Sequence, residues 1–161
     1  MRRIILVLMT LLFTGCAATG KNIIVSDNKA VGPKIVAIDG PRTPWLIEIE
    51  NRLRQHGFKV LRWASQKHVK EKVTEGRVEE FNEASARYIL SIDGYAPLDK
   101  MHRCFGGGVN FDYINAELID AKNNETLVNI SGSGYSENCP PMSGTIFQDI
   151  ADAVNNTWSQ K

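Results

Sequence analysis

The sequence has almost no net charge, few cysteines and no long apolar run. Lys and Arg number 19 against 18 Asp and Glu, without a basic run, so nothing predicts a nucleic-acid partner. The first apolar stretch ends near residue 13, whereas a membrane-spanning helix needs about 20 apolar residues. Neither a nucleophile elbow nor a helical His-Glu-x-x-His pattern occurs. We therefore expect no enzyme activity, no metal and no cofactor.

What is present at the start is a secretory signal. Arg2-Arg3 precedes an apolar stretch that ends at Phe13, and Thr14-Gly15-Cys16 follows. A basic start, an apolar segment and small residues before a cleavage point are typical of such signals. The segment resembles the lipobox of bacterial lipoproteins, with Phe13 where leucine is usual. This resemblance implies that residues 1–15 are removed and that Cys16 carries lipid; the alternative is an ordinary cleaved signal with an incidental cysteine.

The residues after Cys16 predict a tether and a location. Ala17 follows the cysteine, and the absence of an aspartate there favours the periplasmic face of the outer membrane in a Gram-negative host. Residues 16–32 are mostly small or polar, so we expect a lipidated tether with at most one edge strand, at 23–25. Fully extended, this tether reaches no more than about 50 Å, which keeps a single domain at 33–161 close to its membrane.

The domain begins with a predicted strand-helix-strand unit. Ile35-Val36-Ala37-Ile38 is a short apolar run that suits a buried strand. Thr43 is a good helix N-cap with proline after it, and Gly57 suits the left-handed turn that ends a helix. A second strand follows at 58–63. This order predicts a parallel pair of strands.

The remaining elements complete an α+β fold. Ser65 to Glu83 predicts a polar surface helix interrupted at Gly76. Three strands are expected next, and then a C-terminal helix at about 144–158 with a capping box at Thr145 and Gln148. The predicted architecture is a single mixed β-sheet with helices packed on it, in the order β-α-β-α-β-β-β-α. The last three predicted strands span residues 88–95, 111–120 and 126–135.

The cysteines give the sharpest structural prediction. With Cys16 lipidated, Cys104 and Cys139 remain in an oxidising compartment, where pairing is the default. Both lie almost equally far from Asn123, the centre of the predicted hairpin turn, so they fall opposite each other beyond the strand ends. The alternative is a metal site that adds His102, but a fourth ligand is not evident.

Gly106, Gly107 and Gly108 form the other conspicuous motif. A phosphate-binding loop would open a helix and carry Lys-Ser or Lys-Thr, whereas this run leads into a strand. We expect a flexible entrance to that strand. Because functional loops are often rich in glycine, this disulfide-braced loop is our first candidate for a contact surface.

The other polar and aromatic residues favour structural roles. We expect a capping role for His56 at a helix end and a solvated position for His68. The carboxylates Asp93, Glu117 and Asp120 are expected to be separate surface residues. The tryptophans are expected to pack in or around the core, although adjacent side chains of Trp45 and Trp63 would make a stacking surface; the third tryptophan is Trp158.

Three segments resemble a small α+β domain of bacterial envelope lipoproteins. They are Leu53-x-x-x-Gly57-Phe58-x-Val60, Arg87-Tyr88-Ile89-Leu90-x-Ile92-x-Gly94, and the hairpin from Ala116 to Glu125. That domain is found in lipoprotein activators of penicillin-binding proteins, in the curli secretion lipoprotein and at the amino terminus of TolB. Here Asn123-Asn124 replaces the usual Thr-Gly, and the loop with Cys104 is an addition.

The resemblance implies a non-enzymatic interaction module with a protein partner in the cell envelope. The alternative function is a binder of a small ligand or glycan, which would use the Gly106 loop and nearby aromatic side chains. This alternative predicts a concave site that contains Trp or Tyr.

Overall fold

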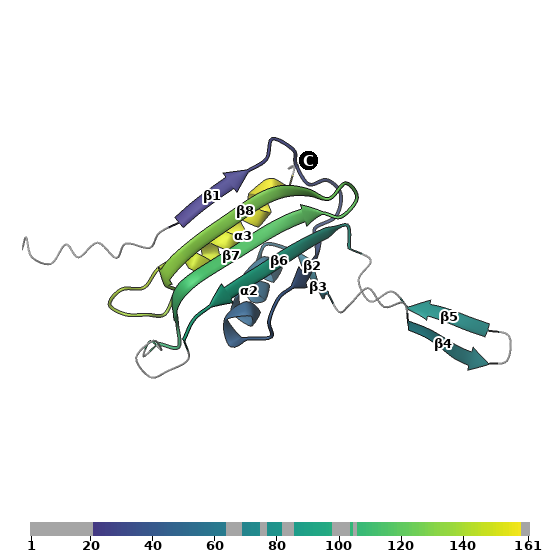
Figure 1. The fold of residues 1–161 in the computed structure, drawn as a ribbon, viewed down its shortest axis with the longest axis horizontal. Helices are drawn as coiled ribbons and strands as arrows, with labels where there is room; N and C mark the ends of the chain where they lie inside the picture. Colours follow the sequence, from purple (N-terminus) through teal and green to yellow (C-terminus); the bar gives the residue numbers. More distant parts are fainter. Residues whose placement is uncertain are drawn as a thin grey trace, which may run out of the picture.

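The computed structural model describes residues 21–63, 69–74, 77–81, 86–97, 104 and 106–158. Six strands form one mixed sheet in the order β1-β8-β7-β6-β2-β3, and two helices pack on one of its faces (Figure 1). This arrangement confirms the predicted α+β class with a C-terminal helix on the sheet. The elements are β1 (Lys21–Val25), β2 (Ile35–Asp39), α2 (Pro44–Gln55), β3 (Lys59–Arg62), β4 (Val69–Thr74), β5 (Arg77–Phe81), β6 (Tyr88–Tyr95), β7 (Asn110–Asp120), β8 (Glu125–Tyr135) and α3 (Ile146–Thr157).

The β2-α2-β3 unit forms as its sequence predicts. The Thr43 side chain accepts a hydrogen bond from the Leu46 N–H at the start of α2. At the other end Gly57 has a φ of 82°, and the N–H of Phe58 donates to the Leu53 carbonyl, which is the hydrogen bond of a left-handed helix terminus. The chain then returns as β3, parallel to β2.

The strands β6, β7 and β8 form an antiparallel meander that supplies most of the sheet. Alternate residues of β6 are buried, starting with Tyr88, which is the predicted face. The side chains that fill the space between this face and the helices are aliphatic or aromatic, so the core lies on one side of the sheet only. Its fully buried members include Val36, Ile49, Leu53, Leu90, Leu118, Val128, Ile150 and Val154.

The predicted capping box of α3 is wrong. The Thr145 hydroxyl makes no capping bond to the backbone and instead donates to Asp149 Oδ2 at 2.8 Å. The cap comes from Glu137, whose carboxylate accepts from the N–H groups of Phe147 (3.1 Å) and Gln148 (2.8 Å). An ionised carboxylate is a stronger acceptor at the positive end of a helix than a neutral hydroxyl.

The predicted surface helix at 65–83 is also wrong. Two antiparallel strands, β4 and β5, form here as a separate two-stranded sheet. Val69, Val73, Thr74 and Val78 are all β-branched, and such residues favour strands over helices. The helix prediction relied on the spacing of the few apolar residues and did not take this preference into account.

The predicted tether is partly docked on the domain. Lys21–Val25 is the edge strand β1, antiparallel to β8. Ala30 is fully buried and its N–H donates to the Thr157 carbonyl at 2.9 Å. Residues 1–20, which contain the predicted signal and Cys16, lie outside the described part of the chain.

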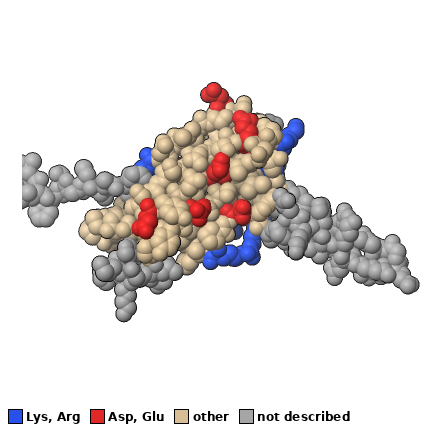
Figure 2. Space-filling model, in the orientation of Figure 1, with Lys and Arg blue, Asp and Glu red and all other residues tan. Residues whose placement is uncertain are grey.

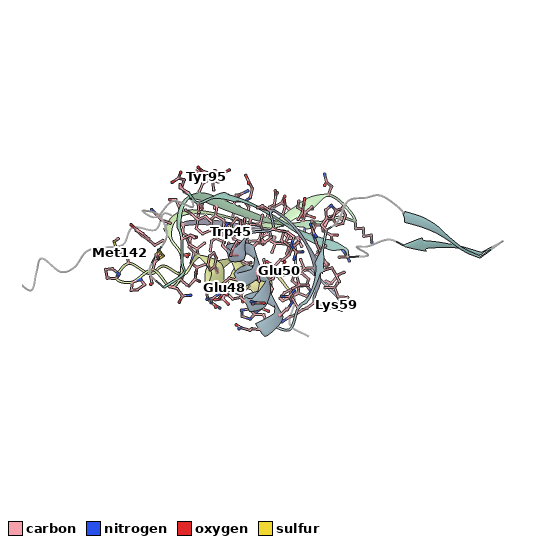
Figure 3. The ribbon with its side chains drawn as sticks, turned by 90° about the horizontal axis from the view of Figure 1, so that it is seen from below. Trp45, Glu48, Glu50, Lys59, Tyr95 and Met142 are labelled. Atoms are coloured by element: carbon pink, nitrogen blue, oxygen red, sulfur yellow. A yellow bond between two sulfur atoms is a disulfide. The ribbon has the colours of Figure 1, made fainter. Side chains whose placement is uncertain are left out.

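The sheet face opposite the helices is polar. Figure 2 looks onto this face and shows acidic side chains across it, with lysine and arginine at its margins. Asp93 and Tyr95 of β6 are both exposed, because they alternate with the buried residues. Figure 3 shows Tyr95 on the outer side of the sheet and Trp45 on the side of the helices.

Candidate functional site

A pocket lies at the end of the sheet where both helices begin. Its volume is about 300 Å³. Four segments that are distant in sequence form its wall: the first turn of α2, the loop before β7, the connection after β8 and the first turn of α3. The lining residues are Pro44, Trp45, Glu48, Cys104, Gly107, Gly108, Val109, Glu137, Asn138 and Phe147.

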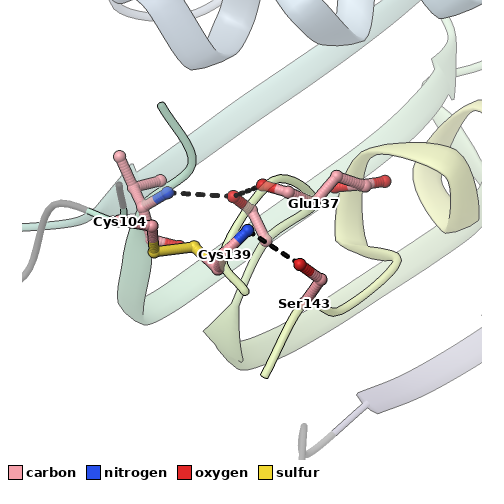
Figure 4. Close-up of a disulfide and its surroundings, with 6 residues drawn as sticks. Cys104, Glu137, Cys139 and Ser143 are labelled. Carbon is pink, nitrogen blue, oxygen red and sulfur yellow. Dashed lines mark hydrogen bonds between the residues drawn. A yellow bond between two sulfur atoms is a disulfide. The ribbon is translucent and has the colours of Figure 1, made fainter. Parts of the chain in front are cut away.

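A disulfide joins the two loops that form one side of this pocket. Cys104 and Cys139 are bonded with a Cα–Cα distance of 4.8 Å, as the hairpin register predicts. The Cys139 N–H donates to Ser143 Oγ at 2.8 Å (Figure 4). The Val109 N–H donates to Ser136 Oγ at 3.0 Å. Cys139 is 2% exposed, whereas Cys104 is partly exposed and lines the pocket.

The metal alternative depends on a residue that the structure does not describe. His102 and His68 both lie outside the described residues. Within the described ranges, no three His, Cys, Asp or Glu side chains are grouped to hold a metal ion.

The three glycines allow the two loops to touch. A Cβ on Gly106 would lie 2.5 Å from the Asn138 carbonyl oxygen, and one on Gly108 would overlap the Glu137 carbonyl and lie 2.7 Å from Cys139 Sγ. Gly107 adopts a φ of 87°, which side chains disfavour. The described glycines of this loop are packed closely against the Cys139 segment, and the flexibility of the loop stays a prediction. Its role as a contact surface stays a prediction.

Aromatic packing fixes the other wall. Trp45 is 6% exposed and meets Phe111 edge to face, with ring centroids 5.3 Å apart. Phe111 contacts Phe147 in the same way at 6.0 Å. Trp158 packs on Phe58 in the core, so both buried tryptophans have the packing role that the sequence predicts. Among the described residues, no ring contact joins Trp45 to Trp63.

Arg52 forms ion pairs with the two glutamates that line the pocket, Glu48 and Glu137. Its guanidinium Nη2 lies 3.2 Å from Glu48 Oε1 and 3.9 Å from Glu137 Oε1, and Nη1 donates to Gln148 Oε1 at 2.7 Å. Glu137 also caps α3, and its side chain is 14% exposed. The pocket thus places the carboxylates of Glu48 and Glu137 beside the rings of Trp45 and Phe147. Such a site suits an apolar group that also carries hydrogen-bond donors.

Local sequence reasoning missed Arg52 and Glu137 as site residues. Glu137 lies in a connection without periodicity, and Arg52 reads as half of an ordinary helical ion pair with Glu48. Only the packing of α2 against α3 brings Gln148 and Glu137 to the same guanidinium.

The three strand carboxylates have separate partners. Asp120 is buried, which corrects the expected surface position. Arg87 pairs with it: Nη2 donates to Oδ2 at 2.6 Å, and Nε donates to Oδ1 at 2.9 Å and to Oδ2 at 3.1 Å. This pairing lowers the Asp120 pKa although burial acts in the opposite direction. Asp93 accepts from the Tyr113 hydroxyl and raises the Tyr113 pKa through its charge. Glu117 accepts from the Thr126 hydroxyl.

His56 occupies the end of α2, as the sequence predicts. It is the C-cap residue, and its N–H donates to the Arg52 carbonyl. Its Nε2 lies 2.9 Å from Asp152 Oδ1 of α3. The side chain therefore links the two helices at the end away from the pocket. None of the helices in the described part of the chain is long and apolar enough to cross a membrane.

Comparison with known proteins gives structural neighbours but no sequence match. No protein-family model and no curated protein sequence matches the chain. A PelC dodecamer from Paraburkholderia phytofirmans is 19% identical over 88% of this chain and 99% of that chain, with a TM-score of 0.49. A variant of the same PelC gives a TM-score of 0.47. TolB from Acinetobacter baumannii, one of the groups that the sequence resembles, is 14% identical over 86% of this chain and 31% of that chain, with a TM-score of 0.42. At these values the neighbours assign no function to the chain.

Proposed function

We propose that the chain is a lipid-anchored, non-enzymatic interaction module on the periplasmic face of the outer membrane. The observation that carries the proposal is the pocket at the disulfide-braced end. Its loops are held by a covalent bond and by backbone hydrogen bonds to serine side chains. A concavity fixed in this way loses little conformational freedom when a partner enters it, which favours binding.

The strand register supports a position close to the membrane. Lys21, at the start of β1, is paired with Gly132, near the end of β8. The N-terminal end of β1 therefore points toward the end of the sheet that holds the disulfide loops. From Cys16 to Lys21 an extended chain reaches about 17 Å. Lipid on Cys16 would hold the pocket near the bilayer, within reach of a partner embedded in or lying on the same membrane.

The pocket size indicates how a protein partner would bind. A volume of about 300 Å³ accepts one or two side chains, not a folded surface. Anchoring of a few side chains in a well-packed pocket is how many protein interfaces obtain most of their affinity. Trp45 and Phe147 would contact the apolar part of such an anchor, and Glu48 would accept hydrogen bonds at the rim.

Site-specific crosslinking in cells tests this proposal. A photoreactive residue at Asn138, which lines the pocket, should capture the same partner protein in repeated experiments. The matched control is the exposed Lys59 of β3, at the opposite end of the domain from Met142 and the pocket loops (Figure 3). Equal capture from both positions, or no reproducible partner from Asn138, would contradict the proposal.

The anchor has its own test. Growth with a labelled fatty acid should label the wild-type chain and not a Cys16→Ser variant. Membrane fractionation should then place the labelled chain with the outer membrane. An unlabelled wild-type chain would contradict the proposed lipid anchor, but it would not affect the proposal about the pocket.

A small ligand or glycan is the second candidate for the same pocket. It is favoured by one observation, the concave wall that contains Trp45. A volume of about 300 Å³ is at the lower end of the range for small-molecule sites, roughly 300–1,000 Å³. Titration with peptidoglycan fragments should change the tryptophan fluorescence of the wild-type chain, and Trp45→Phe should remove that change. Trp158→Phe is the matched control, because Trp158 is buried away from the pocket.

A further inference from the structure

The strand β1 is an exposed and apolar edge of the main sheet. Every one of its five residues is exposed, and Ile23, Ile24 and Val25 keep 39%, 61% and 50% of their surface. At the opposite edge, the exposed residues of β3 are Lys59 and Arg62. Charged side chains on an edge strand discourage pairing with another chain, whereas an apolar edge invites it.

Within the described part of the chain, one set of backbone hydrogen-bonding groups of β1 has no strand beside it. The Ser26 N–H donates to the Leu127 carbonyl at 2.9 Å, in the same register as the pairing of β1 with β8. Hydrogen-bonded pairs alternate along an antiparallel ladder, so Asn22 and Ile24 face β8. The backbone groups of Lys21, Ile23 and Val25 therefore point away from the sheet.

We propose that β1 pairs with β1 of a second copy of this chain, antiparallel and centred on Ile23. In this register Ile23 lies opposite Ile23 of the other copy, and Lys21 lies opposite Val25. Lys21, Ile23 and Val25, whose backbone groups point outward, then lie opposite the same three residues of the second copy. Their backbone N–H and C=O groups can therefore form hydrogen bonds between the two strands. The pairing joins the two six-stranded sheets into one.

Charge and shape favour this register over a parallel one. In the antiparallel pair the two Lys21 residues lie at opposite ends, and each lies at the end that carries Asp27 of the other copy. A parallel pair would place the two lysines side by side. Lys21 is also held 2.7 Å from Asp149 Oδ1 on α3, beside a groove of about 370 Å³ between β1 and α3. Ile23 and Val25 line this groove together with charged and polar residues such as Lys29 and Asp152, so it offers both apolar contacts and hydrogen-bonding groups to the second copy.

The chain length outside the structure is compatible with this pairing. The two Lys21 residues would lie about 14 Å apart along the paired strands. Because each chain from Lys21 back to Cys16 reaches about 17 Å, both N-termini can meet one membrane surface. The pairing itself uses only described residues and does not depend on the lipid anchor.

Cysteine crosslinking in the full chain, purified in detergent, tests the register. An Ile23→Cys variant places two thiols directly opposite each other, at a Cα separation of about 5.5 Å, which a disulfide spans. In Ile24→Cys the two thiols are diagonal neighbours at about 7–8 Å, beyond easy reach. We expect mild oxidation to give at least about tenfold more covalent dimer for Ile23→Cys than for its control.

A second measurement keeps the test independent of the introduced thiols. Ile23→Pro removes an N–H that points away from β8, so the pairing of β1 with β8 and the circular dichroism spectrum should be kept. We expect the wild-type chain to dimerise by sedimentation and the proline variant to stay monomeric. Ile47→Lys, at an exposed apolar position on α2, should dimerise like the wild type.

Three outcomes would overturn the proposal. The first is a monomeric wild-type chain at concentrations of tens of micromolar. The second is equal crosslinking of the two cysteine variants. The third is a monomer whose Ile24→Cys thiol becomes protected when vesicles of outer-membrane phospholipids are added, since that would assign β1 to the bilayer. If Ile23→Pro loses its folded spectrum, the two cysteine variants decide the question.

Discussion

Replacing Cys104 with serine and Cys139 with alanine removes the bond that closes the pocket loops. The two cysteines are 35 residues apart, and a cross-link over that length restricts the unfolded chain by about 4 kcal/mol at room temperature. This figure is an upper bound, because unfolded chains in general are more compact than random coils and have less entropy for a cross-link to remove. The sulfur atom of Cys139 is buried, so its loss also leaves a small cavity. We expect the free energy of unfolding to fall by about 3–4 kcal/mol.

Urea unfolding followed by circular dichroism measures this loss. With a slope of about 2 kcal/mol per molar urea, the midpoint should fall by nearly 2 M. Wild-type protein in excess dithiothreitol is the control and should unfold close to the variant. A loss below about 1 kcal/mol would refute the reasoning, because the loops would then be held mainly by their bonds to Ser136 and Ser143.

Three further predictions concern the contacts around the pocket and at the far end of the sheet. Gly108→Ala should destabilise the fold by more than Gly107→Ala in thermal unfolding, since only the first forces the Cys139 segment away; equal effects would mean that backbone strain alone matters. Glu137→Ala removes the cap of α3 and should lower the free energy of unfolding, measured in urea, by about 1–2 kcal/mol. An unchanged free energy would show that water replaces the carboxylate as the acceptor. Asp120 has a lowered pKa in the folded state, so its pairing with Arg87 stabilises the fold above the unfolded pKa of about 3.9. That stability is lost as the pH falls through the lower folded pKa. In Asp120→Asn the free energy of unfolding should therefore depend less on pH in the acid range than it does in the wild type.

Local signals in the sequence determined most of the elements and their type. Thr43, Pro44 and Gly57 mark the ends of α2 because capping chemistry acts within a single turn of chain. The alternation of β6 and the polar turn between β7 and β8 gave the strands and, through the hairpin register, the pairing of Cys104 with Cys139. These features are local or follow from one short turn, so no tertiary information was needed.

Only the tertiary structure decided how distant segments combine. The cap of α3 comes from Glu137 because the connection after β8 brings that carboxylate to the helix, and the local Thr145 cannot compete with its charge. The glycines of the loop before β7 serve close packing against the Cys139 segment, which no spacing in the sequence reveals. Asp120 became a buried partner of Arg87 only when the end of β7 lay beside the start of β6.

The signal and the lipidation of Cys16 are predictions from sequence pattern alone, while the pocket and the exposed edge of β1 exist only in three dimensions. A lipidation motif is recognised as a linear segment, so its residues carry it without a fold. A concave site needs four segments that pack together, and an open sheet edge is defined by the strand that is missing beside it. The sequence therefore determined where the chain is expected to be, and the packing decided which surfaces it offers there.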